Sequence, residues 1–192
     1  MEDTRFDGKT VLVRVDFNVS INNGAIGEDY RIRMSLPTIE YLAKRGAKVI
    51  LASHLGRPRG HDERYSIAPV AKRLTEIIGR SRPPIRFASD CVGVEIEEHI
   101  SKMNKGDILL LENLRFHTEE ESNDPEFSKK LASLADIYVN DAFSTSHRKH
   151  SSTYGAAWLF DIRLAGFNLI KEVKYLSMIR ENPIRPFSLV LG

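Results

Sequence analysis

The sequence predicts an α/β fold, a three-layer domain with a mostly parallel sheet of about six strands. Short runs of continuously apolar residues recur along the chain, and amphipathic helical patterns lie between them. Strands that are apolar throughout are typical of a parallel sheet covered on both faces. Their alternation with helical patterns supplies the crossover connections that parallel strands need. The 192 residues, 42% of them hydrophobic, suit one compact unit with its own core.

Six runs have the character of buried strands. In chain order they cover residues 11–17, 47–52, 85–88, 107–111, 136–139 and 187–191. The last run lies close to the end of the sequence, where a further βα unit would be expected to begin.

Helical patterns fill most of the intervals between these strands. Ser35 is expected to cap the first helix and Gly46 to end it, because serine favours N-caps and glycine favours helix C-termini. Ser66 and Gly79 are expected to have the same two roles in the second helix.

Two more helices and two loops are expected in the first 135 residues. A weaker helical pattern covers residues 94–103, and a clearer one covers 125–134, with proline at an early helical position. Gly24 and its polar neighbours predict an extended loop. Residues 119–124 predict an acidic loop that stabilises the start of the following helix.

A long amphipathic helix is predicted for residues 168–180. Its apolar residues would be exposed unless something covers them, and an exposed apolar face can drive dimerisation. They are Phe167, Leu169, Ile170, Val173, Leu176 and Ile179. Pro183 and Pro186 then mark an exit that resembles a domain boundary. We therefore expect an α/β domain over 1–165 and, over 166–192, an interdomain helix with the start of a second domain.

Composition narrows the class of protein. The net charge is only +2 and the basic residues are spread along the chain, so nucleic-acid binding is not expected. The single cysteine, Cys91, permits no intrachain disulfide and fits a reducing compartment, with a buried thiol. No apolar run approaches the roughly 20 residues of a membrane span. The first residues are acidic and polar, unlike a signal peptide, so a cytoplasmic location and no membrane partner are expected.

Polar stretches follow the strand-like runs at five places. They are residues 16–18, 54–58, 112–116, 140–143 and 147–150. Ligands of parallel α/β sheets bind outside the carboxyl ends of the strands. Arg57, Arg115 and Arg148 lie near such ends, and Arg31 lies in the first long loop. Guanidinium groups bind phosphate and carboxylate with a fixed fork of donors, so this pattern predicts a site for a small, strongly anionic ligand. Each arginine taken alone is more often a surface cation with an acidic neighbour.

Histidines are expected to add hydrogen-bond donors to this site. His54 and His147 lie close to arginines in the sequence, and His150 could contribute as well. The remaining three histidines, His61, His99 and His117, are expected to be structural or solvent-facing. No histidine, cysteine or aspartate cluster has the spacing of metal ligands, so no metal site is expected.

Asp16 and Asn18 alternate across Phe17 at the end of the first strand and therefore point to one side. They could hydrogen-bond a substrate hydroxyl, but a turn-forming role that satisfies local backbone donors is nearly as consistent with the spacing. The sequence contains no phosphate-binding P-loop, dinucleotide fingerprint or nucleophile elbow. No cofactor is therefore expected to bind this chain by itself.

Several longer stretches match one known family. They are RVDFNV (14–19), 31–32 with 36–39, SHLGRP (53–58) with Gly60, LENLRFH (111–117), 119–121, 135–136 with YVNDAF (138–143), 147–148 with 150–151, and 185–187. They occur in the family's order across nearly the whole chain, which makes their combination very specific. On these residues the chain resembles phosphoglycerate kinase.

The resemblance implies a two-domain, hinge-bending enzyme that moves a phosphoryl group between 1,3-bisphosphoglycerate and ADP, giving 3-phosphoglycerate and ATP. This half would be a Rossmann-like domain that binds the phosphoglycerate. Arg31 would be catalytic, reaching towards the transferring phosphoryl group. The implied substrate-binding residues are Asp16, Phe17, Asn18, Arg31, His54, Leu55, Gly56, Arg57, Arg115, His147 and Arg148. Arg115 and Arg148 would hold the phosphate that is not transferred, and Asp16 and Asn18 the hydroxyl.

The chemistry that the resemblance implies agrees with this set of residues. In the ATP-consuming direction the attacking group is a carboxylate, already ionised near neutral pH, so no general base is needed. Phosphoryl transfer depends mostly on positioning and charge stabilisation, which arginines supply. The Mg-ATP or Mg-ADP site would lie in a C-terminal nucleotide domain that should follow Leu191 and Gly192, so this chain alone should be inactive.

Three positions depart from the family pattern, and other functions are open. Ser144 and Ser146 stand where the family more often has glycine and alanine, and Ser20 where proline is usual. The rival function is a non-enzymatic α/β module that binds another phosphorylated metabolite or a partner protein. A nucleic-acid binder has less support, because no aromatic-basic platform is visible.

Overall fold

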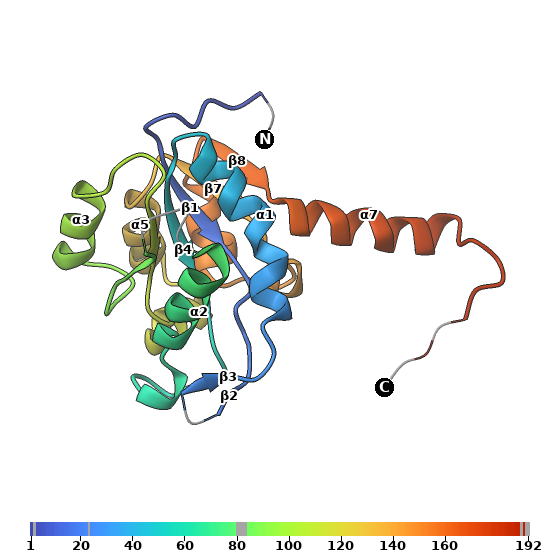
Figure 1. The fold of residues 1–192 in the computed structure, drawn as a ribbon, viewed down its shortest axis with the longest axis horizontal. Coiled ribbons are helices and arrows are strands. Elements are labelled where there is room, and N and C mark those ends of the chain that lie inside the picture. Colours follow the sequence, from blue (N-terminus) through green and yellow to red (C-terminus); the bar gives the residue numbers. More distant parts are fainter. Residues whose placement is uncertain (2, 23, 80–83, 189, 191–192) are drawn as a thin grey trace.

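Six parallel strands form the central sheet, in the spatial order β5-β6-β4-β1-β7-β8 (Figure 1). Their bounds are β1 Thr10–Arg14, β4 Lys48–Ala52, β5 Arg86–Phe87, β6 Ile108–Leu110, β7 Ile137–Asn140 and β8 Ile162–Ala165. The computed structural model describes residues 1, 3–22, 24–79, 84–188 and 190. Within these ranges the predicted six-stranded parallel sheet is confirmed.

The position of β1 in the sheet creates the crevice where a ligand can bind. β1 pairs with β4 on one side, up to Arg14 opposite Ala52, and with β7 on the other, up to Arg14 opposite Asn140. After β1 the chain adds β4, β5 and β6 on one side and later returns to add β7 and β8 on the opposite side. The carboxyl end of β1 therefore lies at a topological switch point, where open α/β sheets leave a crevice.

Helices cover both faces of the sheet, as the continuously apolar strands predict. Alternate residues of a strand point to opposite faces. Val11 and Val13 pack in one buried cluster with α1 (Tyr30–Lys44) and α2 (Ala68–Ile78), whereas Leu12 packs in a second cluster with α3 (Val94–Ser101) and α5 (Pro125–Ser133). Figure 1 shows these two pairs of helices on opposite sides of the strands. The fold is a three-layer α/β domain.

The sixth strand is not where the sequence indicated. Residues 187, 188 and 190 are not in a strand, and residues 189 and 191 of the predicted run lie outside the described residues. The sixth strand is β8, which pairs with β7 at the edge of the sheet. No residue of β8 is fully buried, and Arg163 interrupts its apolar pattern. An edge strand therefore lacks the continuous apolar run that identifies the central strands.

The first helix starts earlier than predicted. α1 begins at Tyr30, with Asp29 at the N-cap position, and Ser35 lies inside it with its hydroxyl donating to the Arg31 carbonyl. Pro37 also lies within the helix. A serine closely followed by proline imitates a helix start, because both residues favour the first helical positions. The turn before Pro37 is buried against the sheet, and this packing stabilises the helix on both sides of the proline.

Predictions for the other helices are largely confirmed. α2 ends at Gly79, whose φ of 69° is left-handed, and the Ser66 hydroxyl accepts from the Ala68 N–H although Ile67 holds the N-cap position. α5 begins at Pro125, with the Asp124 carboxylate accepting from the Phe127 N–H at 2.8 Å. The acidic stretch before it is not a loop, because α4 (Thr118–Ser122) forms there.

Shorter elements complete the description. A two-stranded hairpin of β2 (Ile21–Asn22) and β3 (Ala25–Ile26) stands where a loop was predicted around Gly24. The short helical turns are η1 Glu63–Tyr65, η3 Leu114–Phe116, η4 Phe143–Thr145, η5 Ser151–Gly155 and α6 Ala156–Trp158. Cys91 is buried, as predicted.

The long helix α7 (Phe167–Glu181) is confirmed and extends away from the sheet (Figure 1). Phe167 packs edge-on against Tyr41 of α1, with ring centroids 5.1 Å apart. Ile170, Val173 and Ile179 are 43–48% exposed. The apolar residues beyond the first turn are therefore open to solvent, as expected. Within the described ranges no helix has both the length and the apolar character that a bilayer-spanning segment needs.

Candidate anion-binding site

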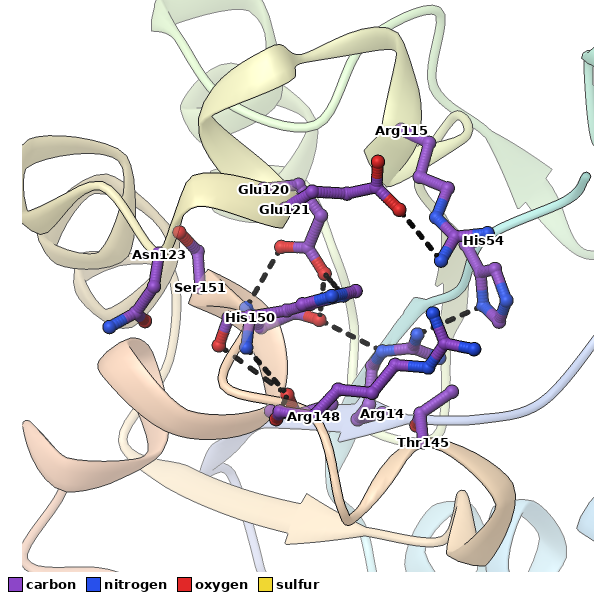
Figure 2. Close-up of polar contacts among 12 residues, drawn as sticks. Arg14, His54, Arg115, Glu120, Glu121, Asn123, Thr145, Arg148, His150 and Ser151 are labelled. Carbon is purple, nitrogen blue, oxygen red and sulfur yellow. Dashed lines mark hydrogen bonds and ion pairs between the residues drawn. The ribbon is translucent and has the colours of Figure 1, made fainter. Parts of the chain in front are cut away.

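Three arginines and two histidines surround one space at the carboxyl ends of the strands (Figure 2). They come from four parts of the chain that are distant in sequence. Arg14 ends β1, His54 follows β4, and Arg115 lies in η3 after β6. Arg148 and His150 lie between η4 and η5, after β7. The predicted convergence of basic side chains at strand ends is therefore present for His54, Arg115 and Arg148.

Arg14 is a fully buried cation at the centre of this group. Its Nε donates to the Ser152 hydroxyl at 2.9 Å, one Nη donates to His54 Nδ1 at 3.0 Å, and the other donates to the Val15 carbonyl. Sequence reasoning included Arg14 in a matching stretch but gave it no role in the site. The signal that could have found it is one charged residue within the apolar run 11–15, since an unpaired buried charge is costly.

His54 is neutral in this environment. Burial and the nearby charges of Arg14 and Arg115 lower its pKa to about 2. Because a guanidinium only donates, Nδ1 of His54 must accept from Arg14, which leaves the ring proton on Nε2. His54 therefore offers one N–H donor without adding a positive charge. Burial also lowers the pKa of His150.

Arg115 and Arg148 each retain an unpaired donor in the site. Arg115 is buried; one Nη donates to the Gly56 carbonyl at 2.5 Å, and the other lies 2.9 Å from a carboxylate oxygen of Glu121. Burial lowers the pKa of Arg115. Within the described ranges, Nε of Arg115 and Nε of Arg148 are buried without a hydrogen-bond partner. Buried N–H groups nearly always have partners, so two orphans in one basic cluster indicate a missing acceptor.

A buried carboxylate is linked to the cluster through a serine. Glu120 of α4 is 1% exposed and accepts from the Ser152 N–H at 2.9 Å and from the Ser152 hydroxyl at 2.6 Å. Ser152 thereby links Glu120 to Arg14. The sequence prediction placed Glu120 in an acidic loop and missed this role. Its signal was weak, because three consecutive glutamates do not show which one turns inwards.

Asn113 joins the two loops that carry His54 and Arg115. Its side-chain oxygen accepts from the Leu55 and Arg115 N–H groups at 3.1 and 3.0 Å, and its amide donates to the Leu55 carbonyl at 2.8 Å. Gly56, in the same loop, has a φ of 60°, and a Cβ there would lie 2.3 Å from the Tyr65 ring. Glycine is therefore required for this loop to approach Tyr65 and present its carbonyl to Arg115.

A second polar group forms beside the cluster around Asp16. One carboxylate oxygen of Asp16 pairs with Arg31 and accepts from the Ser144 hydroxyl at 2.6 Å, and the other accepts from the Asn18 N–H at 3.1 Å. The Asn18 side chain accepts from the Gly56 N–H at 2.9 Å. Both residues thus satisfy nearby backbone donors, which is the turn-forming alternative that the sequence left open. A pocket of about 300 Å³ adjoins them, lined by Asp16, Tyr30, Arg31, Met34, Ser35, Phe143, Ser144, Asn168 and Glu172.

The structure places the other predicted site residues less centrally. The Phe17 and Leu55 side chains are buried in the hydrophobic core, so they can position their polar neighbours but cannot line the site with their rings or methyl groups. Arg57 is exposed, and its charge contributes to the lowered pKa of Arg115. His147 is exposed. The site therefore has a buried centre and an exposed basic margin.

One group of potential metal ligands occurs among the described residues. The ligand atoms of Asp90, Cys91 and His117 lie within 4.8 Å of one another. Sequence spacing did not reveal it, because two separate segments contribute. His117 Nε2 is already 2.5 Å from the Asp90 carboxylate, and the Cys91 thiol donates to the Glu112 carbonyl at 3.0 Å. Burial raises the pKa of this thiol, which opposes the thiolate that binds metals.

Comparison with known proteins gives a consistent family. The family model described as "Phosphoglycerate kinase" matches residues 1–192. The phosphoglycerate kinase of Dictyoglomus turgidum is 54% identical over 192 residues, which cover 100% of this chain and 48% of the relative. That of Coprothermobacter proteolyticus is also 54% identical, with the same coverage.

Solved structures agree with the sequence comparison. The crystal structure of phosphoglycerate kinase from Pyrococcus horikoshii matches with a TM-score of 0.86 and 35% identity, covering 97% of this chain and 46% of that one. The structure of phosphoglycerate kinase from Coxiella burnetii gives 0.84 and 36%, with the same coverage. The chain spans about half the length of the curated relatives it matches.

Proposed function

The chain belongs to the phosphoglycerate kinase family, and we propose that it supplies the phosphoglycerate-binding half of such an enzyme. The complete enzyme would transfer a phosphoryl group between 1,3-bisphosphoglycerate and ADP, a step of glycolysis. The observation that carries this proposal is the pair of buried, unpartnered Nε donors of Arg115 and Arg148 in one basic cluster. We expect the enzyme to act in the cytoplasm, apart from membranes and nucleic acids.

The phosphate that is not transferred would bind to this pair of arginines. A charge-assisted hydrogen bond contributes about 1.5–3 kcal/mol, so two guanidinium groups could give useful affinity for a dianion. His54 would add its neutral Nε2–H, and the exposed Arg57 would attract the ligand to the margin of the site. Arg14 would contribute positive potential from behind, since its own donors are bonded within the protein.

The reacting end of the substrate would lie towards Asp16 and Arg31. In the proposed complex Asp16 and Asn18 bind the hydroxyl, and Phe17, Leu55, Gly56 and His147 shape the surrounding loops. Arg31 would stabilise charge on the transferring phosphoryl group, because phosphoryl transfer relies on positioning and electrostatic stabilisation. A carboxylate nucleophile needs no general base, so Asp16 serves in binding rather than in proton abstraction.

The described residues do not fit the magnesium–nucleotide part of the reaction. Mg²⁺ prefers oxygen ligands, whereas the one group of potential ligands found in the described ranges includes a thiol and an imidazole. We propose that the half of the relatives beyond this chain binds Mg-ATP or Mg-ADP. Residues 1–165 would then form the acid-substrate domain, and 166–192 the interdomain helix with the start of the nucleotide domain. The isolated chain would bind phosphoglycerate without catalysing transfer.

Calorimetric titration with 3-phosphoglycerate tests this proposal. The folded chain should bind saturably, and Arg148→Ala should weaken binding at least tenfold, because it removes one of the two unpartnered donors. Arg163→Ala is a matched control, since Arg163 lies over the exposed Trp158 ring, apart from the cluster. Circular dichroism confirms that all three proteins are folded.

Two results would contradict the proposal. No heat of binding with folded wild-type protein would mean that this chain has no phosphoglycerate site of its own. A phosphorylated sugar or a peptide that binds more tightly than 3-phosphoglycerate would favour the non-enzymatic binding module.

A further inference from the structure

The guanidinium of Arg115 is largely occupied before any ligand arrives. One Nη donates to the Gly56 carbonyl, which leaves Nε unpartnered once the other Nη is paired. That other Nη pairs with Glu121 (Figure 2). A phosphate that is to make two parallel hydrogen bonds with Arg115 needs a second donor beside Nε. Because the Gly56 carbonyl is fixed in the loop, Glu121 is the contact that can give way.

Glu121 differs from the neighbouring Glu120 in how firmly it is held. Glu120 is 1% exposed and accepts two hydrogen bonds from Ser152. The Glu121 side chain is 52% exposed, and its ion pair with Arg115 is the one polar contact that the described residues give it. It also lines a surface pocket of about 350 Å³ together with Arg115. Glu121 can therefore swing into solvent at small cost, whereas Glu120 cannot leave its position without exposing buried donors.

We propose that Glu121 sets the affinity of the anion site by competing with the ligand for Arg115. The inference rests on the proposed function, because it takes the same cluster as the anion site. In the free protein the Glu121 carboxylate occupies the place of one oxygen of the ligand at Arg115. An arriving dianionic phosphate displaces it, and on release Glu121 returns. Each binding event must first break the ion pair between Arg115 and Glu121. This lowers the affinity for the ligand and favours its release.

Glu121→Gln tests this competition, with inorganic phosphate at pH 8 and 3-phosphoglycerate as probes. The variant keeps the shape of the side chain but weakens its hold on Arg115, so both probes should bind roughly 2- to 10-fold more tightly, the size expected for a half-exposed ion pair plus the removed repulsion. Glu119→Gln is the matched control. Glu119 lies two residues earlier on α4 with an exposed side chain, and its substitution changes the net charge equally.

The outcomes separate competition from other roles. Tighter binding in Glu121→Gln with less than a twofold change in Glu119→Gln supports the proposal. Equal changes in the two variants reduce the effect to net charge and overturn it. Weaker binding in Glu121→Gln would show that Glu121 orients Arg115 for the ligand and would also overturn it. If wild-type protein binds and only the Glu121 effect is missing, this inference fails alone; if no variant binds either probe, the proposed function fails with it. Thermal melting confirms that each variant is folded.

Discussion

Buried charges linked through a serine hold the centre of the site. Arg14 donates to the Ser152 hydroxyl, which in turn donates to the buried carboxylate of Glu120. This arrangement compensates the charge of Arg14 inside the protein while its potential still extends into the site. Glu120 and Glu121 also offset part of the mutual repulsion of the three neighbouring guanidinium groups (Figure 2).

His54 should make the free energy of unfolding depend on pH below about 6.5. Its pKa is about 2 in the folded protein and near 6.5 in the unfolded chain. As the pH falls below 6.5, the unfolded state binds a proton that the folded state excludes, so folding stability is lost by about 1.4 kcal/mol per pH unit from this group. Urea unfolding at pH 7.5 and 5.0 should show about 2 kcal/mol more acid destabilisation in wild-type protein than in His54→Gln.

Taking the difference in stability between wild type and His54→Gln removes the contribution of the other titrating groups. Asp141 acts in the opposite direction, because burial raises its pKa to about 6, and it therefore adds stability as the pH falls. It is present in both proteins and drops out of the difference. His61→Gln, at an exposed position, serves as the control. Equal pH dependence of wild type and His54→Gln would show that His54 is not held neutral in the folded protein.

At the scale of elements, the start of α7 is tied to the sheet rather than capped by its own residue. Gly166 at the N-cap position has no side chain, and the Asp141 carboxylate after β7 accepts instead from the Asn168 N–H at 2.9 Å and the Leu169 N–H at 3.4 Å. A Cβ at Gly166 would lie 2.1 Å from Asp141, so glycine is needed for this approach. The end of one strand thus determines where the long helix begins.

Removal of this acceptor should loosen the first turn of α7. Asp141→Ala is expected to destabilise the protein by about 1 kcal/mol, the usual cost of losing a helix cap. Hydrogen exchange should accelerate at the amides of Asn168 and Leu169, whereas Asp141→Asn keeps an acceptor oxygen and should preserve their protection. Asp161→Ala, at an exposed position, is the control. Unchanged exchange at these amides in Asp141→Ala would show that α7 is held by its apolar contacts alone.

At the scale of the whole molecule, the order of the strands forms the site, and α7 forms a separate extension of the domain. The switch point at β1 gathers basic residues from four strand ends into one crevice. α7 begins after β8, at the edge of the sheet, and extends away from it (Figure 1). In the proposed enzyme this helix would carry the second half of the protein and would be covered by it.

The exposed face of α7 should cause the isolated chain to self-associate. Val173 and Leu176 are 48% and 45% exposed, and contiguous apolar surface of this kind favours association. Light scattering should show an average mass that rises with protein concentration, and Val173→Ser combined with Leu176→Ser should keep the chain monomeric. Lys171→Ser combined with Lys174→Ser, on the same helix, is the control. A monomer at every concentration would contradict this prediction.

The central sheet and much of the site were predictable, because both depend on local patterns. The run Val11–Leu12–Val13 has the apolar character of a doubly covered strand, and Arg115 and Arg148 lie in polar stretches that come after such runs. The edge strand β8 was not predictable, because its half-exposed residues carry no continuous apolar signal. Ser35 was misread as a cap because only the burial of Ile32 against the sheet shows that the helix begins earlier.

The sequence by itself determined the α/β class, the family and the basic character of the site, since these follow from periodicity, residue chemistry and ordered motifs. Only the tertiary structure decided which charges meet. It turned Arg14 and Glu120 inwards to a shared serine, left Arg115 and Arg148 with unpartnered donors, and placed Glu121 on Arg115. The physical reason is distance: hydrogen bonds and ion pairs act over a few ångströms, and the residues concerned come from segments that only the parallel sheet brings together.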